Sequence, residues 1–253
     1  MGPIITLLTD FGTADGYVGE MKGKLLSLVP DAELVDITHE IPAQDVEAGR
    51  LTVARVWRRF PSRTVHIVVV DPGVGSARAG LVVVSDGRAL VGPDNGVLSP
   101  ALLVADARVV ALAVPPGASP TFHGRDVFVP AAAAIANGEP IDALGLPAHD
   151  PIVLRTPEPV RADDGSLVGE VIHVDRFGNA VTNLIGLRGG TIELGSTQIS
   201  VRRTYSEVPI GALVAVVGSS GFIEIAVRDG DAARRLRLMR GARVVLRTSR
   251  ASS

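Results

Sequence analysis

Two aspartates, Asp10 and Asp71, each stand at the end of a short apolar run that would form a buried strand. A Gly-containing loop follows each of them, and Arg78 comes shortly after Asp71. Carboxylates at the carboxyl ends of parallel strands share the sheet edge where ligands bind in open α/β folds. Asp10 suits a sugar diol, because one carboxylate can accept hydrogen bonds from two adjacent hydroxyls. The alternative is structural: Asp10 would cap a turn or helix, and an Asp71–Arg78 pair would hold a tight turn.

Three further polar residues in loops, Asp15, Asp94 and His123, could join this edge. His123 lies between a Pro-rich loop and the start of a helix, although a lone histidine is more often a surface or core residue than a functional one. The other histidines have weaker contexts and no ligand spacing. A metal cluster of His123 with the aspartates is conceivable, but the sequence contains no HxxxH spacing and Arg78 would repel a cation. We therefore expect a site without a metal ion.

Two loops in the last third of the chain could contact a ligand. One is residues 175–179 (DRFGN), in which Phe177 could stack on a flat base and Asn179 could hydrogen-bond its edge. The other is residues 218–222 (GSSGF), with Glu224 behind it. The alternative, which the residues alone favour, is a pair of ordinary hairpin turns.

The elements that must position these residues change in type along the chain. Apolar strands over 4–8, 33–37 and 66–70 alternate with amphipathic helices over 17–28 and 45–60, which predicts a mostly parallel sheet with flanking helices. A hairpin over 81–91, a strand over 109–114 and helices over 98–105 and 127–137 follow. From residue 151, short strands and turns predict a barrel-like all-β domain. We expect an α/β domain over 1–155, a linker over 156–165 and the β domain over 166–253.

Composition restricts the function classes. The 253 residues carry a formal net charge of -2, which argues against nucleic-acid or membrane binding driven by charge. The absence of cysteine excludes disulfides and thiolate metal sites. Charges, Gly or Pro interrupt every apolar run, so no membrane span is expected. The N-terminus shows no basic segment of a signal peptide, which makes the cytoplasm the expected location.

Taken together, these blocks resemble the S-adenosyl-L-methionine (SAM) hydroxide adenosyltransferases and, more distantly, the SAM-dependent fluorinase and chlorinase. The resemblance covers nearly the whole chain. It runs in order through residues 9–12 (TDFG), 70–75 (VDPGVG), Arg78, 92–96 (GPDNG), 122–126 (FHGRD), 175–179 (DRFGN) and 218–221 (GSSG).

The resemblance implies an α/β domain, a C-terminal β-barrel and a homotrimer with each active site between subunits. It implies hydrolysis of SAM to adenosine and L-methionine without a cofactor. By their positions in the motifs, Asp71, Arg78 and His123 would position the water, and Asp10 would bind the ribose hydroxyls. The remaining substrate-binding candidates are Phe11, Asp15, Asp94, Asn95, Asp175, Phe177, Asn179, Ser219, Ser220 and Glu224.

Two alternatives stay open. The halogenases of this group have other residue types at the Asp–Arg–His positions, and the fluorinase has an inserted loop after the third strand. Here all three residues are present, and Arg78 runs almost directly into the next apolar run, which favours water over halide. Val181 stands where the fluorinase has a bulky aromatic, so substrate contacts there should differ. The second alternative is a non-catalytic adenosine- or SAM-binding module.

Overall fold

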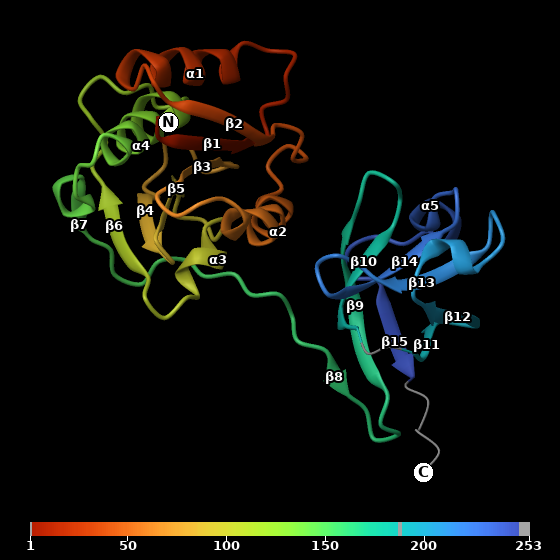
Figure 1. The fold of residues 1–253 in the computed structure, drawn as a ribbon. Coiled ribbons are helices and arrows are strands. Elements are labelled where there is room, and N and C mark those ends of the chain that lie inside the picture. The colour runs from red at the N-terminus through yellow and green to blue at the C-terminus, as the bar shows by residue number, and fades with distance from the viewer. Residues whose placement is uncertain (1, 187–188, 248–253) are drawn as a thin grey trace. The chain divides into compact units, whose positions relative to one another are not determined.

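The computed structural model describes residues 2–186 and 189–247. The chain divides into two compact units, and the boundary along the sequence lies between Arg155 and Thr156 (Figure 1). Within the described residues, the first unit contains a seven-stranded sheet in the order β2-β1-β3-β5-β4-β6-β7. The strands are β1 (Ile4–Thr9), β2 (Glu33–Thr38), β3 (Val65–Val69), β4 (Gly80–Ser85), β5 (Arg88–Pro93), β6 (Arg108–Leu112) and β7 (Gly145–Pro147).

The sheet of the first unit is mixed, so the expectation of a mostly parallel sheet is confirmed only for the part formed by β2, β1, β3 and β5. β1 pairs in parallel with β2 and β3, and β3 pairs in parallel with β5. β4 runs antiparallel to both β5 and β6, and β7 runs antiparallel to β6. The reversal comes from the hairpin turn at Asp86 and Gly87, which both have positive φ angles (48° and 68°). The hairpin itself was predicted, but not that its second strand inserts beside β3.

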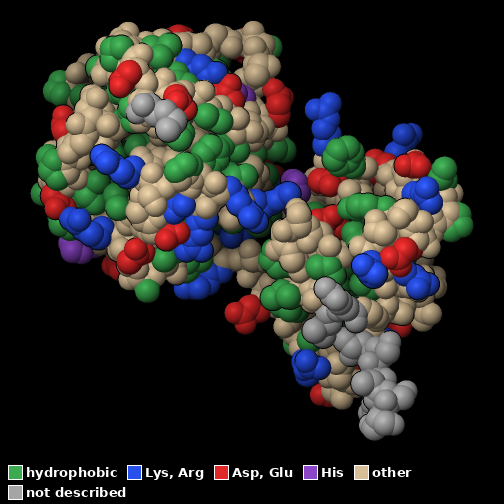
Figure 2. All heavy atoms as spheres, viewed as in Figure 1, with side chains coloured by type: hydrophobic (Ala, Val, Ile, Leu, Met, Phe, Trp, Pro, Cys, Tyr) green, Lys and Arg blue, Asp and Glu red, His purple; other side chains and the backbone are tan. Residues whose placement is uncertain are grey.

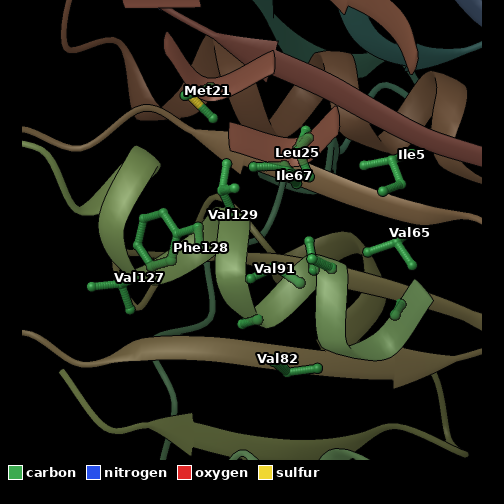
Figure 3. Close-up of a cluster of buried hydrophobic side chains, with 14 of the residues drawn as sticks. Ile5, Met21, Leu25, Val65, Ile67, Val82, Val91, Val127, Phe128 and Val129 are labelled. Atoms are coloured by element: carbon green, nitrogen blue, oxygen red, sulfur yellow. The ribbon is translucent and has the colours of Figure 1, made fainter. Parts of the chain in front are cut away.

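Helices cover both faces of this sheet, as the alternation of buried residues along the strands requires. Ile67 and Val69 face the core that includes Met21 of α1 (Tyr17–Leu28), part of which Figure 3 shows. Val68 and Val70 face the opposite core. The other helices of this unit are α2 (Val46–Val56), α3 (Ser99–Leu102) and α4 (Val129–Ala136), with the short turns η1 (Trp57–Arg59), η2 (Gly124–Phe128) and η3 (Ile141–Ala143). α1 and α4 contribute to the first core, and α2 and α3 to the second.

The second unit is a closed barrel, which confirms the barrel-like expectation. Seven of its described strands follow the order β10-β14-β13-β12-β11-β15-β9, and pairing of β9 with β10 closes the ring. They are β9 (Leu167–Val174), β10 (Ala180–Ile185), β11 (Thr191–Leu194), β12 (Thr197–Arg202), β13 (Leu213–Val217), β14 (Phe222–Val227) and β15 (Arg243–Arg247). Only β12 and β13 pair in parallel among these described strands. The unit also contains η4 (Tyr205–Glu207) and α5 (Ala232–Leu236).

The segment expected to be a linker, residues 156–165, contains a short strand, β8 (Val160–Arg161). Val160 pairs with Val168 and Arg161 with Leu167, so β8 extends the barrel beyond β9. The turn between β8 and β9 allows this pairing, because Gly165 adopts a positive φ of 82°. Residues 248–253, the end of the expected β domain, lie outside the described residues.

In the described part of the chain, no helix is both long enough and apolar enough to cross a membrane. The face shown in Figure 2 carries both acidic and basic side chains, in agreement with the near-balanced total of 25 Lys and Arg against 27 Asp and Glu.

Candidate active site

Asp71 and Arg78 lie in one loop of the first unit and His123 lies in another, and the three side chains meet through hydrogen bonds. Asp71 follows β3, Arg78 precedes β4, and His123 directly precedes η2. Arg78 Nε donates to Asp71 Oδ1 at 2.9 Å, and Arg78 Nη2 donates to Asp71 Oδ2, which makes a bidentate pair. Arg78 Nη2 also lies 3.0 Å from His123 Nδ1. The side chains of Arg78 and Asp71 are only 10% and 5% exposed, so this pair is shielded from bulk water.

The guanidinium of Arg78 determines the protonation of His123. An arginine can only donate hydrogen bonds, so Nδ1 of His123 is the acceptor and the proton of the neutral ring sits on Nε2. Burial of the imidazole, together with the positive charge of Arg78, holds the pKa of His123 below its usual value, while Asp71 and Asp126 oppose the shift. The neutral ring therefore predominates at pH 7, with its Nε2–H available to a ligand oxygen.

Further contacts fix the guanidinium plane of Arg78. Nη1 donates to the carbonyl oxygen of Ala79 at 3.3 Å, and the guanidinium carbon lies 5.4 Å from the ring centroid of Phe128. Counting only the described residues, these contacts and those to Asp71 and His123 use four of the five N–H groups. One N–H of Arg78 thus stays available for a small ligand.

The loops that carry the three residues pack directly on one another. Gly75, in the turn after Asp71, has a φ of 75°, and a β-carbon there would collide with the carbonyl oxygen of Pro120. Pro120 lies just before His123 in the second loop. Only glycine satisfies both the left-handed backbone and this close approach, so Gly75 brings the Asp71 turn up to the His123 loop.

Asp10 lies at the same sheet edge as Asp71, because β1 pairs in parallel with β3 and Thr9 stands opposite Val69. Asp10 Oδ2 accepts a hydrogen bond from the backbone N–H of Gln44 at 2.7 Å. The next residue, Phe11, contacts the ring of Phe122 edge-on, with the ring centroids 5.9 Å apart. The Asp10 loop is thereby linked to the loop of His123.

The other candidate residues of the first unit differ in whether their polar atoms form hydrogen bonds within the protein. Asp15 is exposed. Asp94 Oδ1 accepts a hydrogen bond from Ile152 N at 2.8 Å. Asn95 Nδ2 donates to the carbonyl oxygen of Val70 at 2.8 Å, and its Oδ1 accepts from Val97 N at 3.1 Å. Asn95 therefore supports the backbone directly before Asp71.

In the barrel, the expected ligand loops are well-formed turns. Asp175 Oδ1 accepts hydrogen bonds from the backbone N–H groups of Phe177 and Asn179, both at 2.9 Å, and Oδ2 accepts from Asn179 Nδ2 at 3.0 Å. These bonds hold the turn that presents Phe177, whose side chain is strongly exposed (76%). An exposed aromatic on a rigid turn offers a flat surface for stacking.

The second barrel loop joins β13 to β14 and exposes Ser219 and Ser220. Glu224, on β14, accepts a hydrogen bond from the hydroxyl of Tyr205 at 3.1 Å. Burial and the adjacent Glu224 raise the pKa of Tyr205 to about 12, so its hydroxyl stays protonated at neutral pH.

Two buried residues near Asp10, Thr9 and His39, were not singled out from the sequence. Thr9 Oγ1 lies 2.9 Å from His39 Nδ1, and both residues are buried. The usable signal was that His39 directly follows β2, the parallel neighbour of β1, so it had to lie at the same sheet edge as Asp10. No group of three or more His, Asp or Glu side chains in the described ranges is placed to hold a metal ion. Both oxygens of Asp71 instead face Arg78.

Almost the whole chain is similar to proteins of one known family. Residues 5–145 match the SAM hydroxide adenosyltransferase N-terminal domain, and residues 169–245 match the SAM hydroxide adenosyltransferase C-terminal domain. The chain is 40% identical to the (R)-S-adenosyl-L-methionine hydrolase of Thermus thermophilus, over 96% of this chain and 98% of that protein. It is 28% identical to the fluorinase of Nocardia brasiliensis, over 88% and 90% of the two chains.

A solved structure gives the same result for the fold. The crystal structure of an uncharacterized conserved protein from Thermotoga maritima is similar to this one with a TM-score of 0.87 and 32% sequence identity. The match covers 96% of this chain and 99% of that one.

Proposed function

Since this chain belongs to the SAM hydroxide adenosyltransferase family, we propose that it is an enzyme that hydrolyses SAM to adenosine and L-methionine. The observation that carries the proposal is the hydrogen-bonded set of Asp71, Arg78 and His123 at the sheet edge that also holds Asp10. The identity of 40% to a hydrolase, against 28% to a fluorinase, favours water over halide as the nucleophile.

The reaction is a displacement at C5′ of the ribose. An oxygen of water or hydroxide forms a bond to C5′, and the electron pair of the C5′–S bond moves to sulfur. The sulfonium becomes the neutral thioether of methionine, so the leaving group needs no general acid. If water is the nucleophile, one proton is released. The difficulty is to hold a small oxygen nucleophile in line with the C5′–S bond at about 3–3.5 Å.

Arg78 and His123 supply the contacts to that oxygen. The free N–H of Arg78 and the Nε2–H of His123 are both donors, and donors favour an oxygen that carries negative charge. His123 therefore orients and stabilises hydroxide rather than removing a proton from water at Nε2. Asp71 holds Arg78 in place through both carboxylate oxygens. Removing one such donor typically costs about 10²–10³ in kcat.

Asp10 binds the substrate rather than the nucleophile. Its Oδ2 is fixed by the N–H of Gln44, and its remaining acceptor positions accept the two ribose hydroxyls. Phe11 borders this position through its contact with Phe122. In the barrel, Phe177 stacks on the adenine base, and Asn179, Ser219 and Ser220 contact the adenine or methionine ends.

We further propose a homotrimer in which the barrel of one subunit completes the site of the next. No metal or organic cofactor takes part, because the positive charge that a nucleophilic oxygen needs comes from Arg78. The enzyme acts in the cytoplasm, in keeping with the absence of cysteine from the sequence. Excess EDTA should leave turnover unchanged, and a loss of activity that Mg²⁺ or Zn²⁺ restores would contradict the absence of a metal.

The proposed function is tested by incubating the purified protein with SAM and separating the products by chromatography, with and without chloride. We expect adenosine and methionine in equal amounts at a rate independent of chloride. Formation of 5′-chloro-5′-deoxyadenosine in the chloride arm would indicate a halogenase. SAM that stays bound and unreacted after long incubation would indicate a binding module.

A further inference from the structure

The loop that carries Asp10 is held by the end of the neighbouring strand, β2. We propose that His39 is a positioning residue that fixes Asp10 through Thr9, and so determines how well the ribose is bound. The inference rests on the proposed role of Asp10 as the acceptor of the ribose hydroxyls. His39 itself is buried (4% exposed) beneath the loop and acts only through other residues.

Polar contacts connect the loop with the protein surface in one continuous chain. The backbone N–H of Phe11 donates to Thr9 Oγ1 at 3.2 Å, and Thr9 Oγ1 lies 2.9 Å from His39 Nδ1. On the other side of the ring, His39 Nε2 lies 3.1 Å from Asp36 Oδ1. Lys22 Nζ lies 2.6 Å from the other oxygen of Asp36. Because Thr9 accepts from Phe11, its own proton is free to go to His39 Nδ1, and the neutral ring then carries its proton on Nε2, the nitrogen nearer the Asp36 carboxylate.

Backbone groups of residues 39–44 also form hydrogen bonds to the Asp10 loop. The carbonyl oxygen of His39 accepts a hydrogen bond from the N–H of Gly12 at 2.8 Å. Gln44, in the same segment, donates its N–H to Asp10 Oδ2 and adopts a left-handed φ of 66°. A non-glycine residue in that region is strained, which is tolerated where surrounding contacts require the geometry. Residues 39–44 therefore hold both the side chain of Asp10 and the turn that follows it.

β1 contains a second threonine–histidine pair that serves as an internal comparison. Thr6 Oγ1 lies 2.7 Å from His66 Nδ1, and both side chains are buried. Thr6 is in the middle of β1, four residues before Asp10, whereas Thr9 directly precedes Asp10. Both pairs are buried and join a threonine hydroxyl to a histidine Nδ1. They differ in that Thr9 also accepts a hydrogen bond from the backbone N–H of Phe11, in the Asp10 loop. Their comparison separates positioning of Asp10 from a general effect on folding.

The test uses Thr9→Val, which keeps the shape of the side chain and removes the hydroxyl, and Thr9→Ser, which keeps the hydroxyl. Thr6→Val is the matched control. We expect Thr9→Val to raise the Kd for adenosine and the KM for SAM about tenfold, with kcat within about threefold, since displacement of a positioning group weakens productive binding. Thr9→Ser should restore both values. Thr6→Val should lower the Tm comparably and leave Kd and KM unchanged.

A double variant shows whether Thr9 acts through Asp10. In an Asp10→Ala background, Thr9→Val should raise the Kd for adenosine no further, because the group that it positions is gone. Additive effects of the two substitutions would overturn the inference, as would an unchanged Kd in Thr9→Val or an equal rise in Thr6→Val. Should Thr9→Val not fold, Asp36→Ala changes the exposed end of the chain, and we expect an increase of about threefold in Kd; no increase would overturn the inference.

The two proposals fail in different ways in these experiments. Wild-type protein that binds adenosine but does not convert SAM would contradict the proposed function, and the Kd values would still decide the role of His39. Wild-type protein that converts SAM, with Kd and KM unchanged in Thr9→Val, would contradict only the role of His39. Wild-type protein that neither converts SAM nor binds adenosine would contradict both.

Discussion

Arg78 Nη2 and His123 Nδ1 lie 3.0 Å apart, and the direction of this hydrogen bond decides what His123 can do. The guanidinium has only donors, so the imidazole accepts at Nδ1 and carries its proton at Nε2. A histidine in this state offers a donor to the site and has no free nitrogen with which to remove a proton. The site is thus a set of N–H groups suited to an oxygen nucleophile with negative charge.

Substitution of His123 distinguishes a donor from a base. His123→Ala should lower kcat by about 10²–10³ and leave the KM within about threefold, because the lost contact is made to the nucleophile. His123→Gln, whose amide can still donate near the position of Nε2, should retain more activity than His123→Asn. Release of adenosine, followed by chromatography, measures each rate.

The exposed His149 provides the control for these variants. His149→Ala should turn over SAM at the wild-type rate. Wild-type turnover in His123→Ala would show that this histidine has no part in the chemistry, and equal losses in the Gln and Asn variants would favour a base over a donor.

Asp10→Ala should affect binding more than turnover. Loss of a hydrogen bond to a charged group is worth about 1.5–3 kcal/mol, which corresponds to an increase in KM of about 10–100-fold. We expect kcat to stay within about fivefold. Initial rates over a range of SAM concentrations give both parameters, and Asp31→Ala, at an exposed carboxylate after α1, is the control. A fall in kcat at an unchanged KM would place Asp10 with the nucleophile instead.

The sheet edge that holds Asp10 and Asp71 could be predicted from the sequence, because each follows an apolar run and alternating helices require parallel neighbours. The pairing of β5 with β3 could not, since the hairpin sequence defines its own turn but not which of its strands joins the existing sheet. That insertion makes the sheet mixed.

Within the site, the contact of Asp71 with Arg78 could be predicted as a pair within one turn, whereas the contact with His123 was expected only from the resemblance, because no local pattern relates two separate loops. His39 was missed for a related reason: its contact with Thr9 depends on strand neighbours that are distant in sequence. For Asn95, whose motif predicts substrate binding, the structure adds what no motif could give: its amide hydrogen-bonds to the backbone of Val70 and Val97. A motif identifies the type of residue at a position but not the partner of each of its polar atoms.

The activity should decrease at acid pH as His123 becomes protonated. Burial and the charge of Arg78 keep the pKa of His123 below 6.5, so the neutral ring persists to a lower pH than in an unfolded chain. Protonated Nδ1 can no longer accept from Arg78, and the two cations then repel each other. We expect kcat to fall with a midpoint below pH 6.5, and His123→Gln to lack this acid limb. A midpoint above pH 6.5 would contradict the assigned state of the ring.

Folding stability should depend on pH through His66. Burial, with a smaller contribution from the charge of Arg88, lowers the pKa of His66 to about 4. Between about pH 6.5 and 4 the unfolded chain therefore binds a proton that the folded chain excludes, so stability falls as the pH falls. The loss approaches about 3 kcal/mol at pH 4. Urea denaturation at pH 7 and pH 4.5 measures it.

His66→Asn provides the comparison, because its amide oxygen can accept from Thr6 but does not titrate. The variant should show a smaller difference in stability between the two pH values than the wild type. An equal difference in both proteins would mean that other groups cause the acid sensitivity.

The origin of the new oxygen tests the central claim most directly. SAM is incubated with the enzyme in ¹⁸O-labelled water, and adenosine is analysed by mass spectrometry, with unlabelled adenosine plus enzyme in the same water as the control for exchange. The account predicts one ¹⁸O atom in the 5′-hydroxyl of adenosine and none in methionine. Adenosine without the label, or 5′-methylthioadenosine as the product, would contradict attack by solvent oxygen at C5′.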